Sequence, residues 1–259
     1  MLKIQVLIAT MHQEDYNLLE KMNIQTDAVV INQCDQEAYN EFLYQGHTII
    51  WINTKQRGLS KSRNMALSYA TGDICLIADD DLVYNDGYEK EVKNAFERCN
   101  KADIIAFGIN RVYQTHTTID AAKRERRAPK NKYYSSVKLA FLRKSIVKTG
   151  LFFNTFIGAG TPYGSGEESL FLRNARKKRL VIYETDKVLS VVSFLNSTWF
   201  KGYDEGYYFN KGVFLAAAYG RLAGLYKWYF IIQSRKISKL KWTQVNKCLK
   251  EGIKKYFDL

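Results

Sequence analysis

The sequence predicts an α/β protein with a mainly parallel central sheet flanked by helices. Stretches of strand length alternate with stretches of helical periodicity over the first half of the chain, as in strands joined by covering helices. The run Ile74–Ala78 consists of small and branched apolar residues and is short enough to be a buried parallel strand. A chain of 259 residues is long enough for one large domain, or for one domain with a helical extension.

Each expected element has its own local signal. Apolar runs bounded by polar or turn residues predict strands at Lys3–Thr10, Ala28–Gln33, His47–Asn53, Ile74–Ala78, Ile104–Ile109 and Val137–Phe141. Apolar residues at helical spacing predict helices at Gln13–Met22, from Ser60 to Gly72, and at Asp86–Cys99. In the second helix we expect Ser60 to be the N-cap and Gly72 to lie just past the end.

Three consecutive carboxylates, Asp79, Asp80 and Asp81, follow the strand Ile74–Ala78. In open α/β sheets, ligands bind at the carboxyl ends of the strands. Neighbouring carboxylates repel one another, and Mg²⁺ or Mn²⁺ removes that cost because it takes oxygen ligands. In an extended segment Asp79 and Asp81 point to one side, and Asp80 points to the other, toward the structure or a ribose. The alternative is a solvated acidic turn in which an aspartate caps the next helix.

A second informative stretch, residues 152–172, is rich in glycine and aromatic residues. Three glycines, Gly160, Gly164 and Gly166, allow the backbone to approach a ligand closely. Glu167 and Glu168 follow and begin an apolar helix. The pair can supply a general base, whereas the helix macrodipole alone also favours acids in a first turn.

The formal net charge is +13, from 39 Lys and Arg against 26 Asp and Glu. This excess predicts an anionic partner or substrate, and nucleic acid, an acidic membrane surface and a nucleotide diphosphate all satisfy it. The four cysteines and three histidines are scattered, which indicates reduced cytosolic thiols and no zinc site. The first apolar stretch, Ile4–Ala9, has only strand length, so we expect no signal peptide.

Residues 111–134 lack clear periodicity and contain the basic run Lys123–Arg127. One interpretation is a solvated, mobile loop. The other is a flap or ligand-binding segment over the site, because long loops in compact domains are often functional.

The C-terminal part differs in composition, so we expect an α/β domain at residues 1–210 and a basic amphipathic helical region at residues 211–259. Between Arg221 and Lys255 there are ten Lys or Arg residues and one acid, Glu251, interleaved with aromatic and aliphatic residues. Basic helices with aromatics suit an anionic membrane surface. A basic outer face on helices packed against the core gives the same pattern.

The segment Val213–Gln233 is mostly apolar, but Arg221 and Lys227 interrupt it. A spanning helix needs about 20 apolar residues with few charges. We therefore expect no transmembrane helix here.

Several motifs occur together in one order along the chain. They are VLIAT near the N-terminus, Asp35 after the second strand, RGLSKSRNMALSYATGD, the aspartates Asp79 and Asp81 at Asp-x-Asp spacing, and GSGEE. With this ordered set, the chain resembles the family 2 glycosyltransferases over about residues 3–183. The resemblance implies the nucleotide-sugar-binding GT-A fold, here with a basic helical C-terminal extension.

The resemblance implies an inverting transfer of a hexosyl or N-acetylhexosaminyl group from a nucleotide diphosphosugar, commonly a UDP-sugar. The acceptor would be a saccharide or a lipid-linked saccharide in cell-surface polysaccharide synthesis, with the enzyme cytoplasmic and peripheral on the inner face of the membrane. Carried onto this chain, the resemblance places Thr10 and Asp35 at the nucleotide base or ribose. It places Arg63 near the donor and Lys61 near the phosphates. Asp79 would lie by the ribose or metal with Asp80 beside it, and Asp81 would be the main ligand of Mn²⁺ or Mg²⁺. Of the acidic pair, Glu167 and Glu168, the resemblance makes Glu168 the base.

Two features depart from the family pattern. Glu168 stands where the family often has Asp, and its longer side chain would shift the acceptor position. Residues 191–212 contain no His, although many relatives offer one there as a further metal or phosphate ligand. Either Asp81, water and the diphosphate hold the metal, or the dependence on metal is weaker than usual.

Functions of other classes remain open. A nucleic-acid-binding protein would explain the charge, but it leaves the acid cluster without a purpose, and no RRM, KH, helix-turn-helix or zinc-finger signature is present. We therefore expect no nucleic-acid partner. A nucleotidyltransferase that makes sugar nucleotides would use such a sheet and metal, but its Gly-rich phosphate loop is missing after the first strand. Asp81 and Glu168 argue against a catalytically silent membrane-binding relative.

Overall fold

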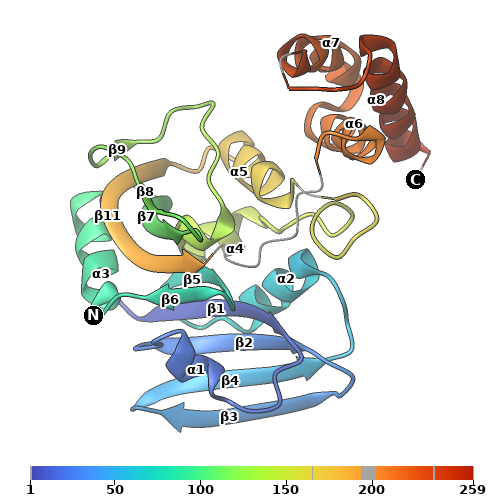
Figure 1. Cartoon of the computed structure of the whole chain (residues 1–259). Coiled ribbons are helices and arrows are strands. Elements are labelled where there is room, and N and C mark those ends of the chain that lie inside the picture. Colours follow the sequence, from blue (N-terminus) through green and yellow to red (C-terminus); the bar gives the residue numbers. More distant parts are fainter. Residues whose placement is uncertain (1, 165, 194–201, 236, 259) are drawn as a thin grey trace.

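The computed structural model describes residues 2–164, 166–193, 202–235 and 237–258. In these residues one mixed sheet carries eleven strands, with helices on both faces and a helical unit at the C-terminal end (Figure 1). The strands are β1 (Ile4–Met11), β2 (Asp27–Gln33), β3 (Ala38–Tyr44), β4 (His47–Thr54), β5 (Ile74–Asp79), β6 (Leu82–Tyr84), β7 (Ile104–Val112), β8 (Thr117–Asp120), β9 (Arg126–Arg127), β10 (Leu139–Leu142) and β11 (Ile182–Ser193). The helices are α1 (Leu18–Lys21), α2 (Leu59–Tyr69), α3 (Tyr88–Arg98), α4 (Arg143–Thr149), α5 (Glu167–Lys177), α6 (Glu205–Tyr219), α7 (Ala223–Ser234) and α8 (Trp242–Phe257), with 3₁₀ turns η1 (Ser136–Lys138) and η2 (Gly220–Leu222).

The central strands run parallel, as predicted, in the order β4-β2-β1-β5. Strand β10 lies antiparallel between β5 and β7, and β11 pairs in parallel with β7. Antiparallel edge strands, β3 next to β4 and β6 next to β11, complete the sheet. Because Ala9 of β1 lies opposite Asp79 of β5, the carboxyl ends of these two strands meet at one edge of the sheet.

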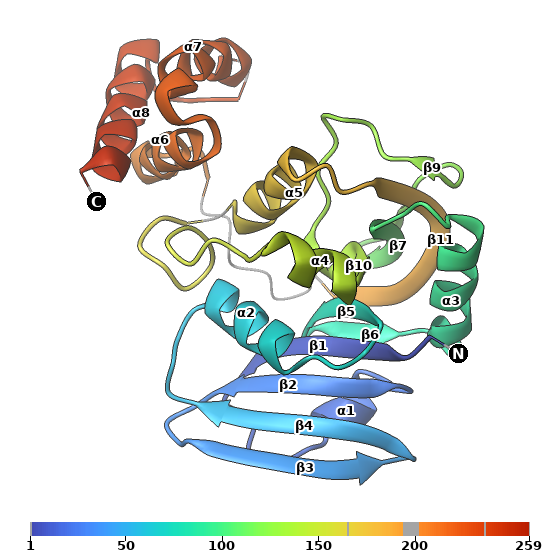
Figure 2. The same ribbon diagram turned by 180° about the vertical axis from the view of Figure 1, so that it is seen from behind.

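Apolar side chains cover both faces of the sheet. One face carries a buried cluster in which Trp51 packs with residues of α1 and α3, including Tyr88. The other face carries a second cluster, in which Phe141 packs with residues of α2, α4 and α5, including Phe171. Figure 2 shows α2, α4 and α5 together on that side. Burial on both faces stabilises the parallel strands and explains why their sequences are apolar throughout.

The first expected helix, residues 13–22, is much shorter than predicted, because only the four residues of α1 are helical. Just upstream, the Asp15 carboxylate accepts a hydrogen bond from the backbone N–H of Asn17 at 2.9 Å. Such local side-chain bonds offer the backbone an alternative to the helix.

The expected start of the second helix was wrong, and its end falls one residue earlier than predicted, with Ala70 as the C-cap. Gly58, with φ of 120°, is the N-cap of α2, and Ser60 is buried in its first turn. Gly72 lies beyond the helix end, where an added Cβ would sit 2.7 Å from the Cβ of Gln5. Glycine at position 72 therefore allows a close approach to β1 and does not end the helix.

Three strands on the main path of the sheet, β3, β6 and β11, are not among the predicted ones. Most residues of β3 are exposed, and those of β6 alternate over only three positions. In β11 the polar residues 184–187 interrupt the apolar pattern. None of the three strands has the long apolar run that identifies a buried strand.

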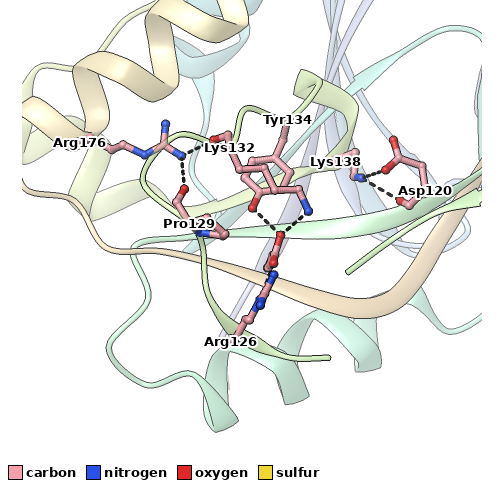
Figure 3. Close-up of polar contacts among 8 residues, drawn as sticks. Asp120, Arg126, Pro129, Lys132, Tyr134, Lys138 and Arg176 are labelled. Carbon is pink, nitrogen blue, oxygen red and sulfur yellow. Dashed lines mark hydrogen bonds and ion pairs between the residues drawn. The ribbon is translucent and has the colours of Figure 1, made fainter. Parts of the chain in front are cut away.

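Residues 111–134 contain two short strands, since β8 pairs with β7 and β9 pairs with β11. The side chain of Glu184 in β11 is only 1% exposed. Its carboxylate accepts hydrogen bonds from Arg126 (2.8 Å), Lys132 (2.7 Å) and Tyr134 (2.6 Å), as Figure 3 shows. Burial by itself would raise the pKa of Glu184, but the three hydrogen bonds outweigh it and lower the pKa to about 2. The second half of the segment is thus fixed to the sheet.

Helices α6, α7 and α8 form a unit with its own apolar core. Helix α6 spans the expected boundary between residues 210 and 211, which therefore lies inside a helix. Helices α6 and α8 approach closely at Gly212 and Gly252, where an added Cβ would overlap the backbone of the facing helix. None of the described helices is long and apolar enough to cross a bilayer.

The helical unit packs against α5 and the glycine-rich loop before it. Arg173 of α5 donates from Nε to the backbone oxygen of Ala218 in α6 at 2.7 Å. An added Cβ on Gly166 would sit 2.6 Å from the ring of Phe214, also in α6. The loop that precedes α5 therefore depends on a helix that follows it in the chain.

Glu184→Gln should lower the free energy of unfolding by about 2 to 3 kcal/mol at neutral pH. The folded pKa lies below the unfolded value, so this stabilisation is present above about pH 4.5 and is lost as the pH falls toward 2. Chemical denaturation across this pH range measures the difference. Glu97→Gln, at an exposed position of α3, is the control and should change little. A pH-independent loss in Glu184→Gln would contradict the ionic interpretation.

Gly252→Ala should cost about 2 to 3 kcal/mol of stability, because the new methyl group overlaps the backbone of Phe209. Gly224→Ala is the matched control in α7, where an added Cβ meets nothing within 4 Å. Alanine is the better helix former, so the control should be neutral or stabilising. Thermal denaturation of both variants checks the opposite signs.

Candidate active site

Asp79, Asp80 and Asp81 lie at the end of β5, beside the end of β1. Thr10 of β1 is buried and donates from Oγ1 to Asp80 Oδ2 at 2.6 Å. The N-cap of the following helix α3 is Gly87, with no side-chain cap. The interpretation of the trio as a helix-capping turn is therefore wrong.

A buried arginine joins the acid trio to the glutamate pair. Arg63 of α2 is 2% exposed and donates from its Nη2 to both oxygens of Asp79, at 2.9 and 3.0 Å. Its Nη1 lies 3.6 Å from Glu167 Oε1 and 3.9 Å from Glu168 Oε1. Burial by itself would lower the pKa of Arg63, but the carboxylates outweigh it and raise the pKa. One guanidinium thus faces three carboxylates from two separate parts of the chain.

The two glutamates occupy different environments. Glu167 is 5% exposed, and its Oε2 accepts the backbone N–H of Gly166 at 3.0 Å. Burial, together with the charge of Glu168, raises the pKa of Glu167. Gly158 packs so closely that an added Cβ would lie 2.9 Å from Glu167 Oε2. Glu167 is an internal group, enclosed by the glycine-rich loop.

Glu168 faces outward, with 32% of its side chain exposed. Its Oε1 accepts two hydrogen bonds from the buried residue Ser136, one from the backbone N–H at 3.0 Å and one from Oγ at 2.7 Å. In the described chain, its Oε2 accepts no hydrogen bond. The carboxylate is therefore fixed by one oxygen and open at the other, as a general base requires.

Ser136 was not among the predicted site residues. It begins η1, directly after residues 111–134, and lies outside every recognisable motif. Only its contact with Glu168 identifies it, since serine is common in turns.

Asp81 is exposed, and its carboxylate forms no hydrogen bond or ion pair with another side chain among the described residues. Partial burial of its carboxyl group, together with the charges of Asp79 and Asp80, raises the pKa of Asp81 to about 6. Neighbouring negative charges disfavour the ionised form of this carboxyl group, and a bound cation would stabilise it. Mg²⁺ and Mn²⁺ suit the position because they prefer oxygen ligands.

The site is better suited to a metal ion with one protein carboxylate ligand than to a metal ion surrounded by several protein ligands. Both oxygens of Asp79 are engaged by Arg63. Within the described residues, no three His, Cys, Asp or Glu side chains are grouped so that they could hold a metal ion. Mg²⁺ and Mn²⁺ are often held by one or two carboxylates plus substrate phosphates, and Asp81 fits that arrangement.

Two predicted site residues are not joined to this cluster. Asp35 is 91% exposed and pairs with Arg57 at 2.5 Å. Arg57 is itself held by backbone oxygens, including that of Thr54 at 3.0 Å. Lys61 is exposed on α2 and lines a shallow surface pocket with Thr155. The structure therefore links Thr10, Arg63, Asp79, Asp80, Glu167 and Glu168, and leaves Asp35 and Lys61 outside.

The family model described as glycosyl transferase family 2 matches residues 18–161, more than half of the 259 residues. The chain belongs to glycosyl transferase family 2. The match covers β2 to β10, α1 to α4 and the acid trio, and it ends before Glu167 and Glu168. It confirms the family predicted from the motifs.

Solved structures confirm the GT-A fold class. The structure of S. aureus TarS 1-349 in complex with UDP is 15% identical, with a TM-score of 0.59, over 99% of this chain and 72% of that one. The structure of S. aureus TarS 1-349 in complex with UDP-GlcNAc is 16% identical, with a TM-score of 0.60, over 99% of this chain and 73% of that one. No curated protein sequence matches the chain.

Ser136→Ala should lower the turnover number for sugar transfer about tenfold and leave the KM for the donor nearly unchanged, because it removes one of the two hydrogen bonds that hold Glu168 Oε1 and leaves only the one from the backbone. Ser135→Ala is the control, since the Ser135 hydroxyl has no hydrogen-bond partner among the residues that the structure describes. Steady-state kinetics of the two variants measures the effect. Equal activity of both variants would show that Ser136 does not position the carboxylate.

Proposed function

We propose that this family 2 member transfers a sugar, with inversion, from a nucleotide diphosphosugar to a saccharide or lipid-linked saccharide acceptor. The observation that carries the proposal is the contact of Arg63 with both acidic groups. Through this contact Glu168, the base that we propose, lies near Asp79 and the aspartates where the diphosphate of the donor would bind. An inverting displacement needs these two functions side by side.

The chemistry is a single displacement. An acceptor hydroxyl attacks the anomeric carbon while Glu168 removes its proton, at the oxygen that Ser136 leaves open. The bond from the anomeric carbon to the diphosphate oxygen breaks on the opposite face, and the nucleoside diphosphate leaves with the electron pair. No enzyme nucleophile is needed for this route.

The remaining residues would bind the donor. Thr10, Asp80 and Asp35 would contact the nucleoside, with Lys61 near the phosphates. Asp81 would hold Mn²⁺ or Mg²⁺ against the diphosphate, and the cation would neutralise charge on the leaving group. Asp79 would act through Arg63, because both its oxygens are occupied.

A UDP-sugar is the donor class that the comparisons support best. The S. aureus TarS structures are complexes with UDP and with UDP-GlcNAc. For this chain we propose a hexosyl or N-acetylhexosaminyl donor and a role in cell-surface polysaccharide synthesis at the inner face of the membrane.

The test is a donor screen with UDP-sugars, each with Mn²⁺, Mg²⁺ or EDTA. Glu168→Gln should reduce UDP release during transfer about 100-fold or more and keep the donor-induced thermal shift. Asp81→Asn should remove the metal-dependent part of that shift, and Glu97→Gln is the exposed control.

The products separate this function from its alternatives. Release of pyrophosphate instead of UDP would indicate nucleotidyl transfer. Tight, salt-dependent binding of generic DNA or RNA with no donor-induced shift would indicate a nucleic-acid-binding protein. Near-normal transfer by Glu168→Gln would overturn the assignment of the base.

A further inference from the structure

Helix α7 carries a row of large apolar side chains on its exposed side. Leu225, Trp228, Tyr229 and Ile232 recur at helical i, i+3, i+4 and i+7 positions and share one face. Their exposed fractions are 69%, 49%, 63% and 63%. A surface helix normally turns such a face toward the core, so this outer face of α7 is an interaction surface.

The inner face of α7 combines apolar residues of the helical core, Ala223 and Ile231, with the buried polar residues Lys227 and Ser234. Lys227, the one charged residue of this helix, is 4% exposed and donates from Nζ to Asn246 Oδ1 of α8 at 2.7 Å. Burial lowers the pKa of Lys227. In the sequence this lysine interrupts an apolar stretch. In the fold its side chain points inward, so the outer face of α7 carries no charged side chain.

Positively charged residues flank α7 on both sides in the sequence. Arg221 precedes the helix, Arg235 follows it, and Lys239 and Lys241 lie in the next connection, all exposed. The sequence contains no Asp or Glu from residue 206 to residue 250. The segment around α7 is thus cationic, with no acid in it to balance the charge.

We propose that the outer face of α7 docks on an anionic lipid bilayer, with the helix lying in the plane of the interface. Aliphatic side chains enter the boundary of the acyl chains, while Trp228 and Tyr229 suit the headgroup level, where one end of a ring is apolar and the other is wet. Arg221 and Arg235 then meet anionic headgroups. A helix of 12 residues is too short to span the bilayer, so it lies on the surface.

A bilayer fits this face better than a second copy of the chain does. In a two-fold dimer the same patch contacts itself, so the cationic flanking residues of the two copies would approach each other without acids from this segment between them. An anionic membrane supplies the missing opposite charge.

The position of α7 leaves the face accessible. Figures 1 and 2 both show α7 on the side of the helical unit that faces away from the sheet. The unit contacts α5, which begins with the acidic pair, through Arg173 and Ala218. Docking would therefore hold the candidate active site near lipid-linked acceptors. This role of docking depends on the proposed function, whereas the binding of α7 to a membrane does not.

The test is co-sedimentation of the full chain with vesicles of phosphatidylcholine alone or mixed with phosphatidylglycerol, without donor. Wild type should bind the mixed vesicles, and Trp228→Ser/Ile232→Ser should bind at least about tenfold more weakly. Leu43→Ser/Ile119→Ser is the matched control, since those residues are 73% and 70% exposed in β3 and β8. The control should bind as wild type.

A second pair of variants tests whether the positive charges near α7 contribute to vesicle binding. Arg235→Gln/Lys239→Gln should weaken binding to the mixed vesicles several-fold, whereas Lys21→Gln/Lys101→Gln, at exposed positions of the α/β domain, should not. UDP release with a soluble acceptor should stay unchanged in Trp228→Ser/Ile232→Ser, which separates failure of docking from failure of the transferase assignment.

Two results would overturn the proposal. One is equal binding of wild type and Trp228→Ser/Ile232→Ser to the mixed vesicles, or no binding by either. The other is a dimer in sedimentation velocity that the same double substitution dissociates, which would assign the face to a second copy.

Discussion

The buried guanidinium of Arg63 is the contact on which the rest of the site depends. It is nearly enclosed, and it faces Asp79 from β5 and Glu167 and Glu168 from α5. A buried cation is stable only when opposite charges compensate it, and the acids likewise need the cation. This mutual requirement fixes α2, β5 and the start of α5 relative to one another, so the fold and the candidate site share one electrostatic constraint.

Two further supports converge on the same carboxylates. Ser136 holds Glu168, and it follows a segment that the buried Glu184 ties to the sheet. From the other side, Phe214 of α6 packs at Gly166, immediately before α5. Both supports come from segments outside the recognisable motifs. They explain how the candidate base at the start of α5 can be held although that helix has no side-chain cap.

The C-terminal helices have two faces with different roles. Toward the α/β domain, α6 supports the glycine-rich loop through tight contacts. On the side away from the α/β domain, α7 presents exposed apolar side chains in a segment rich in positive charge. This exposed face carries no charge because Lys227 points inward and binds Asn246. A single short unit thereby stabilises the site and offers a surface for an anionic membrane, the partner that we propose for it.

The sequence by itself determined the parallel central strands, the place of Asp79, Asp80 and Asp81 after β5, and the family, because apolar runs and ordered motifs are local properties. It did not determine β3 or the caps of α2, whose residues lack a strong local pattern. Only the tertiary structure decided that Arg63 occupies both oxygens of Asp79 and that Ser136 fixes Glu168. Those contacts join residues far apart in the chain, and no local pattern records which distant partner a charged or polar side chain will meet.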